Sequence, residues 1–133
     1  MNRPAPRRHA ASGSPLEAVF GYSRAVRVGN RVLVAGTAPV WPDGSCPGDA
    51  VVQARRCLEI ALTAMAELGA GPSDVVRTRM YVCSADDAAA VGEAHAEAFS
   101  SVRPVATMVV VAGLLDPRWR VEIELEAVVG EGR

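Results

Sequence analysis

The sequence predicts an α+β domain in which two helices cover one face of a mostly antiparallel or mixed sheet. Short runs alternate apolar and polar residues with the period of two that is typical of half-buried strands, and two longer segments repeat apolar residues at helical spacing. A length of 133 residues suits one domain, and the sequence contains no internal repeat. We therefore expect a flexible N-terminal tail over residues 1–15 and a single folded domain over residues 16–133.

The first two strands are expected at residues 23–28 and 31–35, as an antiparallel hairpin. The Gly29-Asn30 dipeptide between them suits a tight turn that needs positive φ. Gly36 ends the second strand and allows another group to approach the backbone closely.

The first long helix is expected to begin after Asp49, which has the right chemistry for an N-cap, and to stop at Gly69. Its apolar positions recur at helical spacing, at Val51, Ala54, Leu58, Ala61, Leu62, Met65 and Leu68. Its predicted polar face carries Gln53, Arg55, Arg56, Glu59 and Glu67. One such apolar stripe is enough to cover one face of a sheet.

The third strand is expected at residues 75–83, and a second helix follows it as far as about Phe99. The segment 84–87, Ser-Ala-Asp-Asp, resembles a capping box with Asp in place of Glu. Pro104 ends any helical continuation and opens the fourth strand, and the fifth strand closes the domain. The predicted order of elements is therefore β-β-α-β-α-β-β.

The last strand, over residues 121–129, has the clearest alternation. Its apolar positions are Val121, Ile123, Leu125 and Ala127, and its acidic positions are Glu122, Glu124 and Glu126. The three carboxylates must share one face, where like charges repel and an unpartnered buried carboxylate is costly. Either this face is open to water, or a partner in a cleft holds some of the acids.

The fourth strand is apolar on both faces, since Val109 and Val111 point one way and Met108 and Val110 the other. The sequence predicts no third helix to cover the second face. Association between subunits through the open face is the economical solution, although composition alone does not choose between two and three copies.

Composition excludes several classes of protein. A formal net charge of −1 gives no electrostatic reason to bind nucleic acid, and no apolar run reaches the roughly 20 residues that span a membrane. The first 14 residues lack the apolar region of a secretory signal. Cys46, Cys57 and Cys83 fit neither a disulfide framework nor a metal site, which agrees with a reducing cytoplasm.

The run Arg-Pro-Val-Ala-Thr-Met-Val-Val-Val at 103–111, followed by the acidic strand, resembles the signature end of the RidA (YjgF/YER057c/UK114) family. The resemblance extends from about Tyr22 to Gly130. It implies a homotrimer of chorismate-mutase-like fold that binds a small molecule in clefts between subunits. It also implies hydrolysis of reactive imines or enamines to ketones and ammonia, without a cofactor or a metal.

The resemblance also implies a set of site residues. Glu122 is the candidate catalytic residue, which would activate the attacking water or bind the ligand nitrogen; the alternative is one more member of a solvated acidic row. Tyr22 would cap the pocket, Gly36 and Thr37 form the turn after the second strand, and Thr107 would offer a hydroxyl or N–H group. His95 lies on an apolar helix stripe, so we expect a core or interface histidine there.

One position departs from the family pattern. Ala106 stands where deaminating members carry an arginine that grips the substrate carboxylate, and Thr107 follows it. Arg24 and Arg120 share a face with pocket residues, but an ordinary surface arginine, or a partner for the glutamates, is the favoured interpretation for both. The remaining possibility is an uncharged ligand in a more apolar pocket.

Three functions therefore compete. The first is a RidA-like deaminase centred on Glu122, and the second is a non-enzymatic trimer that binds a metabolite or protects proteins, which Ala106 favours. The third is RNA cleavage, an activity attached to some relatives. The near-neutral charge and an aromatic content of 5% argue against the third.

Overall fold

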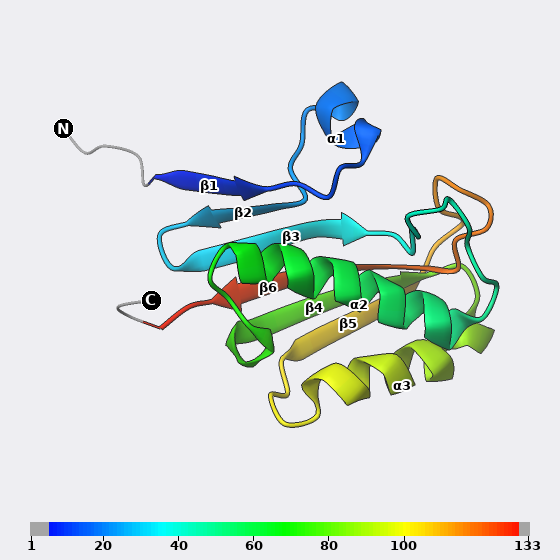
Figure 1. Cartoon of the computed structure of the whole chain (residues 1–133). Helices are drawn as coiled ribbons and strands as arrows, with labels where there is room; N and C mark the ends of the chain where they lie inside the picture. The colour runs from blue at the N-terminus through cyan, green and yellow to red at the C-terminus, as the bar shows by residue number, and fades with distance from the viewer. Residues whose placement is uncertain (1–5, 131–133) are drawn as a thin grey trace.

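Six strands form one mixed sheet in the order β1-β2-β3-β6-β4-β5 in a computed structural model that describes residues 6–130 (Figure 1). The strands are β1 (Arg7–Ala10), β2 (Ala25–Val28), β3 (Arg31–Thr37), β4 (Val75–Val82), β5 (Val105–Val110) and β6 (Val121–Val128). The helices are α1 (Pro15–Phe20), α2 (Ala50–Glu67) and α3 (Ala88–Phe99), with short 3-10 turns at Pro72–Asp74 and Ala85–Asp87. Among the strands of residues 6–130, β4 and β5 are the one pair that is parallel. The predicted α+β class is confirmed.

The two long helices lie across one face of the sheet and enclose the core with it (Figure 1). The side chain of Asp49 accepts hydrogen bonds from the backbone N–H groups of Val51 and Val52, so the predicted N-cap is confirmed. The alternation of the last strand is confirmed as well. Its four apolar side chains are at most 3% exposed, whereas its three glutamates point to the other face.

The N-terminal part of the fold differs from the prediction. Arg7–Ala10 fall within the expected flexible tail, yet they form β1 and pair with β2 in antiparallel register. α1 follows and ends at Gly21, which has a φ of 78°. The four residues of β1 show no apolar alternation, because backbone pairing rather than side-chain burial holds this edge strand. Residues 1–5 of the predicted tail lie outside the described residues.

Gln53 is a second difference, since the sequence places it on the polar face of α2 and the structure buries it completely. Its Nε2 donates to the carbonyl oxygens of Pro47 at 2.7 Å and Arg118 at 3.0 Å. Its Oε1 accepts from the N–H group of Arg120 at 2.7 Å. A buried amide with all of these partners is stable, and it joins α2 to the loops on either side.

The face of the sheet opposite the helices carries charges that neutralise one another. Glu126 pairs with Arg31 and Arg77, and Glu124 pairs with Arg79 and accepts a hydrogen bond from the Tyr81 hydroxyl. β5 adds exposed apolar side chains, Val105 and Val109, to the same face, because they stand in register with Arg77 and Tyr81.

Every helix within residues 6–130 is too short or too polar to span a bilayer.

Candidate functional site

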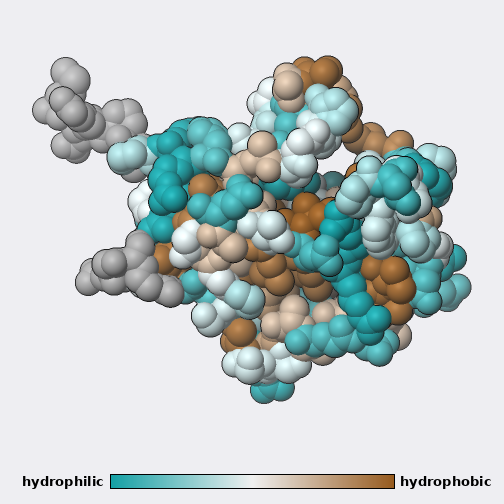
Figure 2. Space-filling view, in the orientation of Figure 1, coloured by the Kyte–Doolittle hydropathy of each residue, from teal (hydrophilic) through white to brown (hydrophobic). Residues whose placement is uncertain are grey.

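A cavity of about 460 Å³ opens between α1, the end of β3, α2 and the loops that precede α2 and β6. Figure 2 shows the surface hollowed between α1 and these loops. The residues that matter for its chemistry are Tyr22, Arg24, Gly36, Thr37, Trp41, Trp119 and Glu122. The structure therefore brings together four of the six residues that the sequence predicts for the site.

A β-bulge at the end of β3 places Gly36 against Glu122. The register with β6 shifts between Val34 and Thr37, so the chain bends away from the regular ladder at this point. A Cβ atom at position 36 would lie 2.6 Å from Oε1 of Glu122, which is closer than real Cβ contacts allow. Glycine is therefore the residue that leaves room for this carboxylate.

Glu122 differs from the other two glutamates of β6. Glu124 and Glu126 are paired with arginines, whereas within residues 6–130 Glu122 makes no hydrogen bond or ion pair. Burial raises the pKa of its carboxyl group; the charge of Arg24 opposes this shift, and Glu124 adds to it. The result is an unpaired carboxyl group on the cavity wall that holds a proton more readily than an ordinary glutamate.

Arg24 is buried in the same cavity, with only 6% of its surface exposed. Its Nη1 donates to the carbonyl oxygen of Gly36 at 2.9 Å and to Oγ1 of Thr37 at 3.3 Å. Its Nε lies 3.6 Å from Oε2 of Glu17, on α1. The interpretation of Arg24 as an ordinary surface arginine is therefore wrong, because the side chain is buried and bonds to groups from other parts of the chain.

Two further predicted residues contact this guanidinium group. The ring of Tyr22 lies below Arg24, 5.4 Å from its Cζ atom, and the side chain is 38% exposed at the cavity mouth. Thr37 is 1% exposed, and its hydroxyl donates to the carbonyl oxygen of Ala35 at 2.7 Å while accepting from Arg24. Thr37 therefore positions Arg24.

The structure does not bring Ala106 and Thr107 to this cavity. Both are exposed residues of β5, and β4 separates β5 from β6, so about 10 Å of sheet lies between them and the strand of Glu122. Arg120 does not line the cavity either, and it pairs with Asp87 at 3.5 Å. Within one chain the predicted site is therefore divided between the cavity and the opposite part of the sheet.

Both tryptophans of the chain, Trp41 and Trp119, line the cavity, and the sequence analysis did not assign them to it. Arg56 of α2 lies over the ring of Trp41, with its Cζ atom 5.9 Å from the ring centroid. The available signal was the placement of both tryptophans in loops, outside the apolar stripes that build the core.

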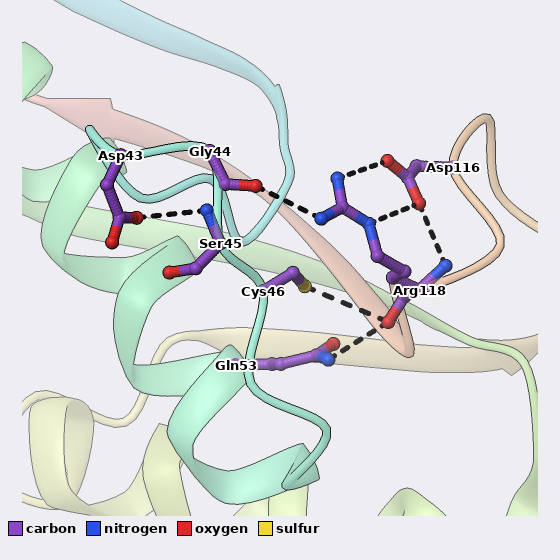
Figure 3. A network of polar contacts seen from close by, with 7 residues as sticks. All are labelled: Asp43, Gly44, Ser45, Cys46, Gln53, Asp116 and Arg118. Carbon is purple, nitrogen blue, oxygen red and sulfur yellow. Dashed lines mark hydrogen bonds and ion pairs between the residues drawn. The ribbon is translucent and has the colours of Figure 1, made fainter.

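A polar network fixes the loops that carry these tryptophans (Figure 3). Arg118 binds the carboxylate of Asp116 with two nitrogens and donates to the carbonyl oxygen of Gly44 at 3.0 Å. These hydrogen bonds lower the pKa of Asp116. The carbonyl oxygen of Arg118 accepts from Gln53 and from the Cys46 thiol. The cavity wall is thus held by contacts between segments far apart in the sequence.

His95, which the sequence predicts as a core or interface histidine, is partly buried and does not line the cavity. Its Nε2 is 2.8 Å from Oγ1 of the buried Thr78, and its ring is 4.9 Å from that of Phe99. Burial lowers the pKa of His95, so the neutral ring is favoured. Among the described residues, no group of three or more His, Cys, Asp or Glu side chains is arranged to hold a metal ion.

The sequence profile of the family described as Endoribonuclease L-PSP matches residues 12–129, nearly the whole described chain. The chain belongs to the RidA (YjgF/YER057c/UK114) family. A solved member of this family from Mycobacterium tuberculosis is 44% identical, with a TM-score of 0.86 over 93% of this chain and 100% of that chain. The predicted family and its fold are confirmed.

Relatives in the RidA family carry different names. An uncharacterised protein of Streptomyces coelicolor is 45% identical over 124 residues, which is 92% of each chain. The 2-iminobutanoate/2-iminopropanoate deaminase of Escherichia coli K12 is 33% identical over 116 residues, which is 84% of this chain and 88% of that protein. The family therefore includes a named imine deaminase.

Proposed function

We propose that this RidA-family protein hydrolyses a small reactive imine or enamine and releases ammonia. The proposal also includes a homotrimer whose inter-subunit clefts hold the ligand, in the cytoplasm. The E. coli relative named as an imine deaminase supports the reaction class. A cavity of about 460 Å³ has the size of a site for small molecules.

The single observation that carries the proposal is the unpaired carboxyl group of Glu122 on the cavity wall. In the proposed reaction, water attacks the carbon of the C=N bond while the Glu122 carboxylate accepts a proton from that water. The same proton passes to the nitrogen, which gives a carbinolamine. Glu122 then moves the hydroxyl proton of the carbinolamine to its amino group, the C=O bond forms, and the C–N bond breaks to release ammonia and a ketone. No cofactor is required, because the imine carbon is already electrophilic.

The divided site supports the proposed subunit arrangement. Thr107 and Ala106 lie too far from Glu122 within one chain, so they reach a shared cleft only from a neighbouring subunit. The open face of the sheet is suitable for such contact, because β5 exposes valines there and the neighbouring arginines and glutamates neutralise one another as ion pairs.

The test is an ammonia-release assay on freshly generated 2-aminoacrylate-type imines and on uncharged imines. We expect turnover of at least one class, and Glu122→Gln should abolish it because an amide cannot accept the proton. Glu126→Gln is the matched control, since Glu126 lies on the same strand and face but is paired with Arg31 and Arg77. No turnover of either class at several protein concentrations would reject the deaminase proposal.

The alternative is a non-enzymatic trimer that binds a metabolite or protects proteins. Ala106 favours it, since family resemblance places an arginine there in deaminating members. If the missing arginine is what disables catalysis, Ala106→Arg should convert an inactive protein into one that deaminates carboxylate-bearing imines. An active wild-type protein would dispose of this alternative.

A further inference from the structure

Arg24 is the feature of the cavity that the proposed reaction does not yet use. The guanidinium group lines the cavity, is almost fully buried, and keeps hydrogen-bonding capacity in reserve. Its Nε is the one buried side-chain nitrogen or oxygen without a hydrogen bond among residues 6–130. Its Nη2 also has no hydrogen-bond partner within these residues. A buried cation in this condition is costly unless a further anion binds to it.

The existing partners hold Arg24 in place without completing its bonding. Gly36 and Thr37 occupy Nη1 alone, and Glu17 is 3.6 Å from Nε, beyond good hydrogen-bond distance. Glu17 is itself engaged by the backbone N–H and hydroxyl of Ser12. The result is a preorganised arginine with donors to spare, on the same cavity wall as Glu122.

The rest of the cavity is suited to a large apolar group. Both tryptophans contribute to its lining, together with Ile60, Val40 and Leu115. An anion whose apolar part is larger than a methyl or ethyl group would use both the arginine and these side chains.

We propose that Arg24 binds the carboxylate of the ligand, and that the ligand carries a bulky apolar side chain which packs against Trp41 and Trp119. Arg24, which directly precedes strand β2, would thus take the role that the family resemblance gives to the arginine replaced here by Ala106. This inference rests on the cavity being the ligand site of the proposed function. It makes Arg24 the residue that determines specificity, while Glu122 performs the chemistry.

The first test measures binding to the wild-type protein by tryptophan fluorescence, because both tryptophans of the chain line the cavity. Three stable probes separate the two parts of the proposal: 4-methyl-2-oxopentanoate, its uncharged analogue 4-methylpentan-2-one, and pyruvate. A charge-assisted hydrogen bond should make the oxo acid bind about 10- to 100-fold more tightly than the ketone. The additional buried carbons of 4-methyl-2-oxopentanoate should make it bind at least about tenfold more tightly than pyruvate.

Substitutions then assign the preference to Arg24. Arg24→Gln should reduce the affinity for the oxo acid to that for the ketone, and Arg24→Lys should retain part of it. Arg120→Gln is the control, since this arginine pairs with Asp87 outside the cavity. Glu17→Gln keeps the guanidinium group and removes its paired carboxylate, so it should strengthen oxo-acid binding even if Arg24→Gln fails to fold.

Two results would overturn the inference. One is equal affinity of the wild-type protein for the oxo acid and the ketone, and the other is a folded Arg24→Gln variant with unchanged affinity for the oxo acid. Neither measurement needs turnover. Carboxylate-selective binding without ammonia release would reject the deaminase and keep Arg24 as the binding residue, whereas turnover without selectivity would do the reverse.

Discussion

Gly36 and Glu122 are in such close contact that a Cβ atom on Gly36 would lie 2.6 Å from Oε1 of Glu122. The contact joins the bulged end of β3 to the beginning of β6. It leaves the backbone of Gly36 free to hold Arg24 through its carbonyl oxygen, at 2.9 Å. One glycine thus sets the positions of both the Glu122 carboxyl group and the Arg24 guanidinium group of the cavity.

Gly36→Ala should therefore damage function more than folding. The added methyl group meets the end of a flexible side chain, so Glu122 rotates away and the free energy of unfolding changes by less than about 1 kcal/mol. A displaced carboxylate should lower turnover by about 100-fold, in line with the effect of misplacing a reacting group by about 1 Å. Steady-state ammonia release and thermal unfolding measure the two effects.

Gly113→Ala is the control for this substitution, because a Cβ atom at position 113 meets no atom within 4 Å. Equal losses of turnover in the two variants would show that the contact with Glu122 is not the cause.

The raised pKa of Glu122 predicts how stability varies with pH. Between the ordinary pKa of glutamate and the raised value, the folded protein binds more protons than the unfolded chain, so stability falls as pH rises through this range. Glu122→Gln should remove that fall. The variant should gain stability over the wild type at pH 7 and lose the advantage below about pH 4, near the ordinary pKa of a glutamate.

Urea unfolding at pH 4, 5.5 and 7 measures this difference. A stability difference between Glu122→Gln and the wild type that is the same at all three values would contradict the assignment of the raised pKa to Glu122.

Gln53→Leu should destabilise the fold, because three partly buried backbone groups lose the hydrogen bond that they make with the Gln53 side chain. These are the carbonyl oxygens of Pro47 and Arg118 and the N–H group of Arg120. We expect a loss of about 3 kcal/mol in the free energy of unfolding. Arg55→Ala on the same helix should change the free energy of unfolding far less, since its pair with Glu97 is exposed to water. Similar losses in the two variants would contradict the role given to Gln53.

Val109→Lys tests the proposed association through the open face. Val109 is 42% exposed in the single chain, and a lysine there would place a charge in the contact between subunits. Sedimentation velocity should show trimers of the wild type and smaller species of the variant, with loss of turnover because the shared cleft is incomplete. Val19→Lys on α1 is the control. A monomeric wild type would reject the trimer.

The sequence predicted the elements whose own periodicity or caps define them. The alternation at Val121–Val128, the Asp49 cap and the Gly29 turn, which has a φ of 62°, all follow from residues close in the chain. Of the residues predicted for the candidate site, Tyr22, Gly36, Thr37 and Glu122 line one cavity. Their prediction depended on family resemblance rather than on the periodicity of the sequence.

What the sequence did not predict depends on partners far along the chain. Arg24 and Gln53 belong to residue types that usually face water, yet both are buried and both make hydrogen bonds to groups 12 or more positions away. Tertiary contact decides such positions, and neither periodicity nor composition carries that information. The surroundings of Ala106 and Thr107 are harder still to predict, since in the proposed trimer a neighbouring subunit would supply them.

The edge strand β1 has a practical consequence for work with shortened forms of the protein. A version that starts at Leu16 would lose the four residues that pair with β2, and it would present the unsatisfied N–H and C=O groups of β2 to other molecules. It would also lose Ser12, which engages Glu17 behind Arg24. Aggregates of such a version would report an uncovered sheet edge rather than the natural assembly.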